Sequence, residues 1–130
     1  MRNTNIILDA SALIAFVYGE KGHAIVAEVL PYAVMSSVNV TEVVKHLLAN
    51  GASEVEINNL IDKSLEKIIA FDRKQAFIAA SLFAHTKQFG LSLADRACLA
   101  LAQDTGFIIY TADKIWHKLN IDSISVNLIR

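Results

Sequence analysis

Short, continuous apolar runs alternate along this chain with longer segments in which apolar residues recur at the helical period. A run such as Ile6-Ile7-Leu8 is typical of a strand that is buried on both faces of a parallel sheet. Strands that alternate with helices favour a parallel sheet connected by right-handed crossovers. The sequence therefore predicts an α/β sandwich.

The expected elements follow from these runs and from the turn residues between them. Strands are expected at residues 6–8, 33–35, 67–70, 107–110 and 124–126. Helices are expected over 13–17, around 25–29, over 38–48, from Ser53 onward, and over 73–85, 92–104 and 113–118. The helix over 73–85 has Ala76, Phe77, Ala80 and Phe83 as its apolar positions, and Asp72 is expected to cap it.

Length and composition fit one soluble domain over residues 1–130. Hydrophobic residues make up 54% of the 130, and the formal net charge is -1, which gives no overall attraction to nucleic acid. A single cysteine, Cys98, excludes an internal disulfide and fits a reducing compartment. The apolar run after residues 1–5 is too short for a signal peptide, and no run reaches the roughly 18 residues of a membrane span. We expect a cytoplasmic protein without membrane contact.

Four of the thirteen acidic residues occupy a special position in the expected fold. Asp9 ends the first strand, Glu42 and Asp95 lie early in their helices, and Asp113 follows the fourth strand by two residues. Strand C-termini and helix N-termini meet at one edge of a parallel sheet, so all four fall there. That edge also favours carboxylates as plain helix caps, and the Ser92/Asp95 and Asn39/Glu42 pairs have the spacing of a capping box.

A metal site explains the four carboxylates better than capping alone. Ser11, Ser92 and Thr111 stand beside three of them and can cap without help, while an added carboxylate gains only about 0.3–1 kcal/mol from the helix dipole. The apolar neighbours predict partial desolvation, and grouped carboxylates would then repel one another and raise at least one pKa. A divalent cation relieves that repulsion. Because the chain has neither a second cysteine nor a His-x-x-x-His pair, Mg²⁺ or Mn²⁺ is favoured over zinc.

The ordered motifs "DASALIAF", "SLADRACLALA" and "TADKIW", with a helical Glu between the first two, resemble a PIN-domain ribonuclease, and most of all the VapC toxins of bacterial toxin–antitoxin pairs. The resemblance spans essentially the whole chain. It implies a three-layer α/β/α sandwich with a parallel sheet of about five strands (PIN-like, Rossmann-like) and metal-dependent endonucleolytic cleavage of RNA within a structured or single-stranded loop. Lys21 and Ala94 stand where relatives often have Pro and Gly, which leaves substrate choice open.

The resemblance also assigns roles to residues. Asp9 and Asp95 are expected as principal metal ligands, with Asp113 binding directly or through water, and Glu42 is expected to orient the attacking water. Supporting roles fall to Ser11 and Thr111 as hydroxyls that hold the carboxylates, to Ser92 as the cap that steers Asp95, and to Asn39.

Contacts to RNA are expected from the cations Arg96, Lys114, Lys21 and Lys45, with His23, His46 and Lys118 as further candidates. Arg96 has two readings, a phosphate contact or a pair with a neighbouring carboxylate. The scattered lysines are equally typical of a solvated surface. Trp116 is expected to be a packing anchor, although an exposed indole there would stack on a base.

Membership of the VapC-like class implies partners. They are a cognate antitoxin protein, an RNA substrate such as tRNA or another structured RNA, and a second copy of the chain in a homodimer. DNA would be reached only through the antitoxin. A groove for the antitoxin is expected from Val43, Leu47, Leu48, Leu60 and Ile61, which core packing also explains.

Two rival functions remain at this level. A phospho-acceptor receiver domain has a similar length and an acidic pocket with a Thr and a Lys nearby, for which Thr111 and Lys114 are available. It needs an acceptor Asp at the end of the third strand, where only Asp72 occurs. A catalytically silent PIN-like module that binds a partner is the second rival.

Overall fold

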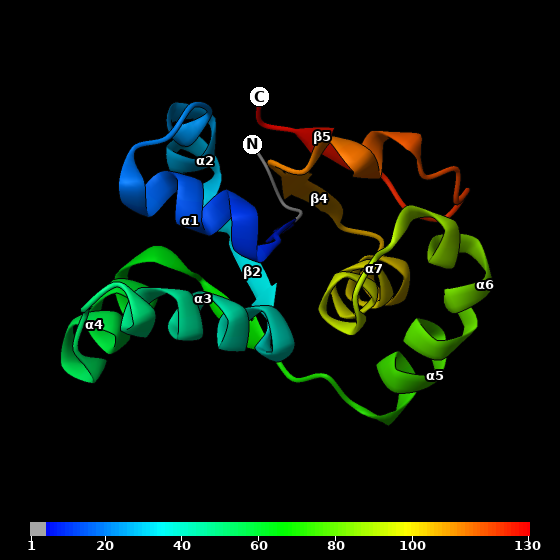
Figure 1. Cartoon of the computed structure of the whole chain (residues 1–130), viewed down its shortest axis with the longest axis horizontal. Coiled ribbons are helices and arrows are strands. Elements are labelled where there is room, and N and C mark those ends of the chain that lie inside the picture. The colour runs from blue at the N-terminus through cyan, green and yellow to red at the C-terminus, as the bar shows by residue number, and fades with distance from the viewer. Residues whose placement is uncertain (1–4) are drawn as a thin grey trace.

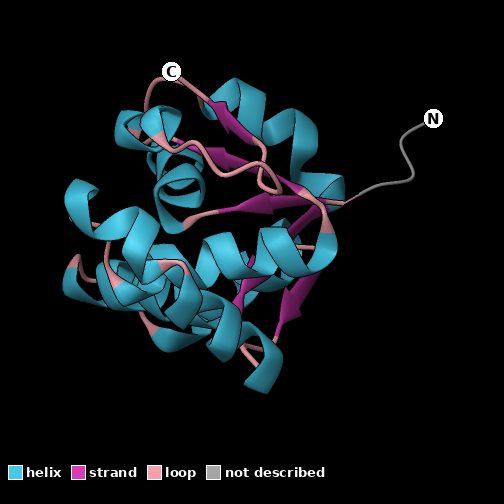
Figure 2. Ribbon diagram, turned by 90° about the vertical axis from the view of Figure 1, so that its right-hand side faces the viewer, coloured by secondary structure: helices cyan, strands magenta, loops and turns pink. Residues whose placement is uncertain are grey.

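The computed structural model of the protein describes residues 5–130, and its centre is one parallel sheet of five strands. The strands lie in the order β3-β2-β1-β4-β5, so the first strand is central and later strands extend the sheet on both sides. Their bounds are β1 (Ile6–Leu8), β2 (Ala33–Ser36), β3 (Lys67–Ile69), β4 (Ile108–Thr111) and β5 (Val126–Leu128). Figure 2 shows the strands stacked side by side with helices around them.

Two helical layers cover the sheet, which confirms the three-layer prediction (Figure 1). One layer contains α1 (Ala10–Tyr18), α2 (His23–Val29), α3 (Ser37–Ala49) and α4 (Glu54–Ser64). The other contains α5 (Arg73–Ser81), α6 (Phe83–Thr86) and α7 (Leu93–Thr105). Short 3₁₀ helices, η1 (Leu30–Tyr32), η2 (Lys87–Phe89) and η3 (Lys114–Lys118), lie in the connections. Within residues 5–130, no helix combines the length and apolarity that a membrane crossing requires.

The central strand divides the core into two halves. Ile6 and Leu8 belong to the apolar cluster on the side of α1–α4, and Ile7 belongs to the cluster on the side of α5–α7. This is the alternation that a strand imposes on successive side chains. All three are fully buried, as the apolar run predicted. Trp116 is also buried in the second cluster, so it is the expected packing anchor and offers no exposed indole.

The predicted helix over 73–85 is wrong in two respects. The segment is divided at Leu82 into α5 and α6, and its buried side chains are Gln75, Ala79, Leu82 and Thr86. Phe77 and Phe83, taken as apolar positions of the helix, are 69% and 51% exposed. The face that packs on α7 tolerates Gln75 because its amide reaches Oδ2 of Asp104 at 3.4 Å. Asp72 caps α5 as expected, accepting a 2.9 Å bond from the Gln75 amide.

Smaller differences concern strand ends and the predicted groove. The last strand is displaced toward the C-terminus, at Val126–Leu128 rather than 124–126. Of the groove residues, Val43, Leu47 and Ile61 are buried in the core, which excludes them from a docking surface, and only Leu48 is exposed. An apolar hollow does lie along α3, but it is lined by Val40, Thr41, Val44, Lys45 and Leu48.

Candidate active site

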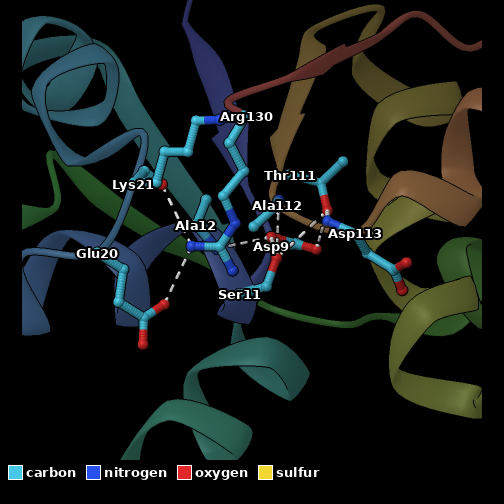
Figure 3. Close-up of polar contacts among 9 residues, drawn as sticks. All are labelled: Asp9, Ser11, Ala12, Glu20, Lys21, Thr111, Ala112, Asp113 and Arg130. Atoms are coloured by element: carbon cyan, nitrogen blue, oxygen red, sulfur yellow. Dashed lines mark hydrogen bonds and ion pairs between the residues drawn. The ribbon is translucent and has the colours of Figure 1, made fainter.

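Asp9 lies at the carboxyl end of β1 and caps α1, as its position after the apolar run suggested. Its Oδ1 accepts bonds from the Ser11 hydroxyl at 2.7 Å and from the Ala12 amide at 2.9 Å. Its Oδ2 accepts a 2.5 Å bond from the Thr111 hydroxyl (Figure 3). The side chain is only 5% exposed. The carboxylate is therefore held in one orientation by the start of α1 and by the end of β4.

The pKa of Asp9 is strongly perturbed. Burial raises it from 3.8 to about 6, because the charged form loses its hydration. The bonds from Thr111, Ser11 and Ala12 act in the opposite direction, while the negative charge of Asp95 adds to the rise. Asp95 is thus close enough to repel Asp9, although the two residues come from different elements.

Thr111 and Ser11 also connect Asp9 to the start of η3. The Ser11 oxygen accepts the Ala112 amide at 3.0 Å, and the Thr111 oxygen accepts the Asp113 amide at 3.0 Å. Asp113 itself caps η3, with its Oδ1 accepting the Ile115 amide at 3.1 Å. Figure 3 shows its carboxylate directed away from that of Asp9. Asp113 therefore belongs to the same backbone network without adding its charge directly to Asp9.

Asp95 and Ser92 form the predicted capping box at the start of α7. The Ser92 hydroxyl oxygen accepts the Asp95 amide at 3.1 Å, and Oδ2 of Asp95 accepts the Ser92 amide at 2.9 Å. The other carboxylate oxygen has no hydrogen bond within the described part of the chain. Asp95 thus caps α7 and keeps one carboxylate oxygen available for a ligand.

Asn39 and Glu42 do not form the capping box that their spacing suggested, because α3 begins earlier and Ser36 is its N-cap. Asn39 instead lies inside the helix, 1% exposed, and its amide nitrogen donates to Oε1 of Glu42 at 3.1 Å and to the Ala94 carbonyl at 3.0 Å. This side chain fixes Glu42 and joins α3 to the first turn of α7. Its own oxygen is buried without a partner among residues 5–130.

Cys98 marks where three of the carboxylates converge. Its thiol is fully buried in α7, and burial raises its pKa well above the usual value, with the negative charges of Asp9, Asp95 and Glu42 adding to the effect. These charges come from the residue after β1, from α7 and from α3, which meet at one edge of the sheet. Cys98 is thus part of the apolar core on the side of α5–α7.

The donor set suits a hard divalent cation, although no three carboxylates are preassembled. Among residues 5–130 there is no group of three or more His, Cys, Asp or Glu side chains placed to hold a metal. The ion pairs among residues 5–130 are Lys74–Asp104 and Arg130–Glu20, so none of the four site carboxylates has a cationic partner in that range. Two carboxylates with water in the remaining positions match the coordination that Mg²⁺ prefers. Asp9 and Asp95 are the pair that the structure couples.

A cleft of about 430 Å³ lies beside this edge, between α1 and α3. It is lined by Ala10, Ser11, Ile14, Glu42, Lys45, His46 and Ala49. Lys45 is the one predicted RNA-contacting cation in its wall, while Lys21 and Lys114 are exposed elsewhere. The cleft therefore gives solvent and ligands a path to Ser11 and Glu42.

Arg96 does not take the second of its two predicted roles, a pair with a neighbouring carboxylate, within the described structure. It forms no ion pair with a carboxylate of residues 5–130. Its Nη1 donates to the Leu91 carbonyl at 3.0 Å, and its guanidinium lies 5.1 Å from the centre of the Phe83 ring. Arg96 therefore braces the loop before α7.

Arg130 forms a long-range contact near the site that the sequence did not predict. Its Nη1 donates to Oε1 of Glu20 and to the Lys21 carbonyl, both at 3.2 Å (Figure 3). The contact fixes the loop after α1 against the end of β5. It joins residues about a whole chain apart, so no local pattern could have indicated it.

Comparisons with known proteins agree with this architecture. A chain of VapBC2 from Rickettsia felis, solved bound to a DNA fragment from its promoter, has a TM-score of 0.72 at 16% identity, covering 96% of this chain and 98% of its own. VapBC-1 from nontypeable Haemophilus influenzae gives 0.72 at 15% identity, with 97% and 98% covered. A toxin–antitoxin complex from Klebsiella pneumoniae gives 0.71 at 20% identity, with 92% and 95% covered. These likenesses show a shared fold.

Curated protein sequences gave no match. The family model of the PIN domain, in contrast, matches residues 6–121, a range that includes all four candidate site carboxylates, Asp9, Glu42, Asp95 and Asp113. Because this match spans most of the sequence, the chain belongs to the PIN domain family.

Proposed function

We propose that the protein is a metal-dependent endoribonuclease and the toxin of a toxin–antitoxin pair. Nuclease chemistry is what the PIN family provides. The observation that carries the proposal is the buried carboxylate of Asp9, which has hydroxyl and amide donors and a nearby acid, Asp95, but no cationic partner among the described residues. Such a carboxylate is unfavourable for the protein alone and becomes favourable when a cation binds.

The side chains divide the work according to their contacts. Asp9 and Asp95 would hold Mg²⁺ or Mn²⁺, with Asp113 contributing directly or through water. Such an ion activates water and neutralises charge on the departing oxygen of a phosphodiester. The bonds from Ser11 and Thr111 keep Asp9 oriented and favour its charged form. Glu42, held by Asn39 and facing the cleft beside Ser11, orients the attacking water.

RNA, such as tRNA or another structured RNA, is the proposed substrate. The overall charge of -1 means that binding depends on local cations, of which Lys45 lines the cleft, with Lys21, Lys114 and Arg96 as further candidates. The protein is proposed to act in the cytoplasm.

An antitoxin protein is the proposed regulatory partner. Its support is the resemblance of the fold to chains solved as VapBC and toxin–antitoxin complexes. The apolar hollow of about 470 Å³ along α3, lined by Val40, Val44 and Leu48 among others, is the surface that suits an apolar partner segment. We also propose a homodimer, and contact with DNA only through the antitoxin.

The receiver-domain alternative is disfavoured by the sheet order. In receiver-like folds the order is 2-1-3-4-5, which places the third strand beside the first. Here β3 is an edge strand next to β2, and Asp72 is exposed and engaged in capping α5. Asp72, which would have to accept the phosphate, therefore follows a strand that is separated from β1 by β2.

The decisive experiment measures cleavage of RNA by the purified chain with Mg²⁺, with Mn²⁺ and with EDTA. The Asp9→Asn and Asp95→Asn variants are compared with Asp62→Asn, which neutralises an exposed carboxylate on α4. Metal-dependent cleavage that both site variants lose and Asp62→Asn keeps supports the proposal. Cleavage that survives in Asp9→Asn contradicts it. Folded wild-type protein that cuts nothing but binds a partner indicates the silent PIN-like module instead.

Metal binding can be tested apart from activity. Thermal unfolding of the wild-type chain is followed as Mg²⁺ is added at neutral pH. Binding at a hundred times Kd adds about 2.7 kcal/mol to the free energy of unfolding. We expect this stabilisation in the wild type and in Asp62→Asn, and its loss in Asp9→Asn. Equal stabilisation of all three would place the ion elsewhere.

A further inference from the structure

An exposed aromatic ring lies against the side chain of Arg96, the residue that follows the proposed metal ligand Asp95. Phe83, the first residue of α6, is 51% exposed, and the guanidinium of Arg96 lies 5.1 Å from the centre of its ring. Arg96 directly follows Asp95 in α7. The Phe83 ring therefore contacts the side chain of Arg96, and Arg96 is next in sequence to a proposed metal ligand.

The contacts of Arg96 give this ring a fixed support. The Leu91 carbonyl accepts the Nη1 bond of Arg96, and the residue is half-buried, so the guanidinium is anchored on one side to the loop before α7. A cation held against an aromatic face is a stable arrangement. Because half of the Phe83 side chain remains exposed beyond this contact, the ring can accept a second planar group.

The charge of the surrounding segment favours a polyanion as the occupant. Between Arg73 and Ala94, a stretch that includes α5, α6 and η2, there is no Asp or Glu, whereas Arg73, Lys74 and Lys87 are cationic. Lys74 is engaged by Asp104 at 2.8 Å, while Arg73 and Lys87 form no ion pair among the described residues. Cations beside an exposed aromatic ring are the pattern of proteins that bind single-stranded nucleic acid.

We propose that Phe83, supported by Arg96, is a stacking site for an unpaired base of the RNA substrate, close to the bond that is cut. This rests on the proposed function. Bases inside a helix are already stacked and paired, so the site selects nucleotides in single strands or loops whose faces are free. Stacking requires a ring but little specificity for the base, because every base offers a π-face.

The test measures binding rather than cleavage, so that its failure differs from failure of the nuclease proposal. Fluorescence anisotropy gives the Kd for a labelled single-stranded RNA in EDTA, and a 2-aminopurine base in the RNA reports stacking by its quenching. The variants are Phe83→Ala, Phe83→Leu, which keeps an apolar group without a ring, and Phe83→Tyr, which keeps the ring. Phe77→Ala is the matched control, since Phe77 is also exposed and has Arg73 5.8 Å from its ring centre.

We expect Phe83→Ala and Phe83→Leu to weaken RNA binding by about tenfold and to lose the 2-aminopurine quenching. Phe83→Tyr and Phe77→Ala should stay within about twofold of the wild type, and an equivalent RNA duplex should show no dependence on Phe83. Equal Kd values for wild type and Phe83→Leu would overturn the proposal, as would the absence of any RNA binding. A change of oligomeric state in Phe83→Ala, measured by gel filtration, would also overturn it, by showing that a second copy of the chain covers this face.

Discussion

Thr111 donates a 2.5 Å hydrogen bond to Oδ2 of Asp9, although 102 positions separate the two residues in the chain. Thr111 ends β4, Asp9 follows β1, and these strands pair in parallel. The bond lowers the pKa of Asp9 against the larger effect of burial, which raises it to about 6. This one pair therefore helps to decide how much charge Asp9 carries near neutral pH.

Replacing Thr111 by valine should destabilise the protein more at pH 8 than at pH 4.5. Above the pKa of Asp9 the lost bond is one to a charged acceptor, worth about 1.5–3 kcal/mol, whereas below it the acceptor is neutral. Urea unfolding at both pH values measures the difference. Thr86→Val is the control, because this equally buried hydroxyl donates to the backbone carbonyls of Leu82 and Phe83 and its loss should not depend on Asp9. Equal losses at the two pH values for Thr111→Val would contradict the assigned role.

In the metal-free protein, the raised pKa of Asp9 predicts a loss of stability as pH rises. The folded state holds this proton more tightly than the unfolded state, so the contribution is complete below pH 3.8 and disappears as pH passes about 6. A difference of about two pH units corresponds to about 3 kcal/mol. The free energy of unfolding in EDTA, measured from pH 3.5 to 7.5, should therefore fall for the wild type relative to Asp9→Asn. A difference between the two proteins that is constant with pH would exclude this titration.

Sequence periodicity predicted the parts of this fold that depend on local signals. The run Ile6–Leu8, the box formed by Ser92 and Asp95, and the cap at Asp72 each depend on residues adjacent in the chain, and the structure has all three. The strand was predictable because a continuous apolar run indicates burial on both faces of a sheet, and the two caps because backbone amides at a helix start need a nearby acceptor.

Contacts between residues far apart in the chain explain the features that the sequence pattern did not predict. The local pattern predicts Phe77 and Phe83 as apolar positions of their helix, but packing on α7 selects the face with Gln75 and Ala79. The spacing of Asn39 and Glu42 predicts a capping box, although Asn39 donates to the Ala94 carbonyl of another helix. In both cases the deciding neighbour is distant in the chain, so the local pattern contains no information about it.

Truncating Asn39 to alanine should separate Glu42 from α7. The change removes the bonds to Oε1 of Glu42 and to the Ala94 carbonyl, and their combined loss costs about 1–3 kcal/mol. RNA cleavage should fall further than RNA binding, because Glu42 loses its orientation. Asn59→Ala on the exposed side of α4 is the control for both measurements. Asn39→Ala protein with wild-type stability would contradict the bridge.

Gly22→Ala should damage the contact between the loop after α1 and the C-terminal strand segment. Gly22 has φ +97°, and a Cβ there would lie 2.6 Å from the Ile129 carbonyl oxygen, a backbone atom that cannot rotate away. Gly51 provides the matched control, since its φ is +94° but a Cβ would meet nothing within 4 Å. Left-handed strain alone costs about 1–2 kcal/mol in either variant, so any excess for Gly22→Ala measures the clash with Ile129. We expect an excess loss of about 1–3 kcal/mol in the free energy of unfolding.

The same variant should also loosen the loop that carries Lys21, because Arg130 follows Ile129 and bonds to Glu20 and to the Lys21 carbonyl. Amide hydrogen exchange in this loop should then be faster in Gly22→Ala than in Gly51→Ala. Equal losses of stability in the two variants would show that Ile129 yields without strain and that this segment does not fix the loop.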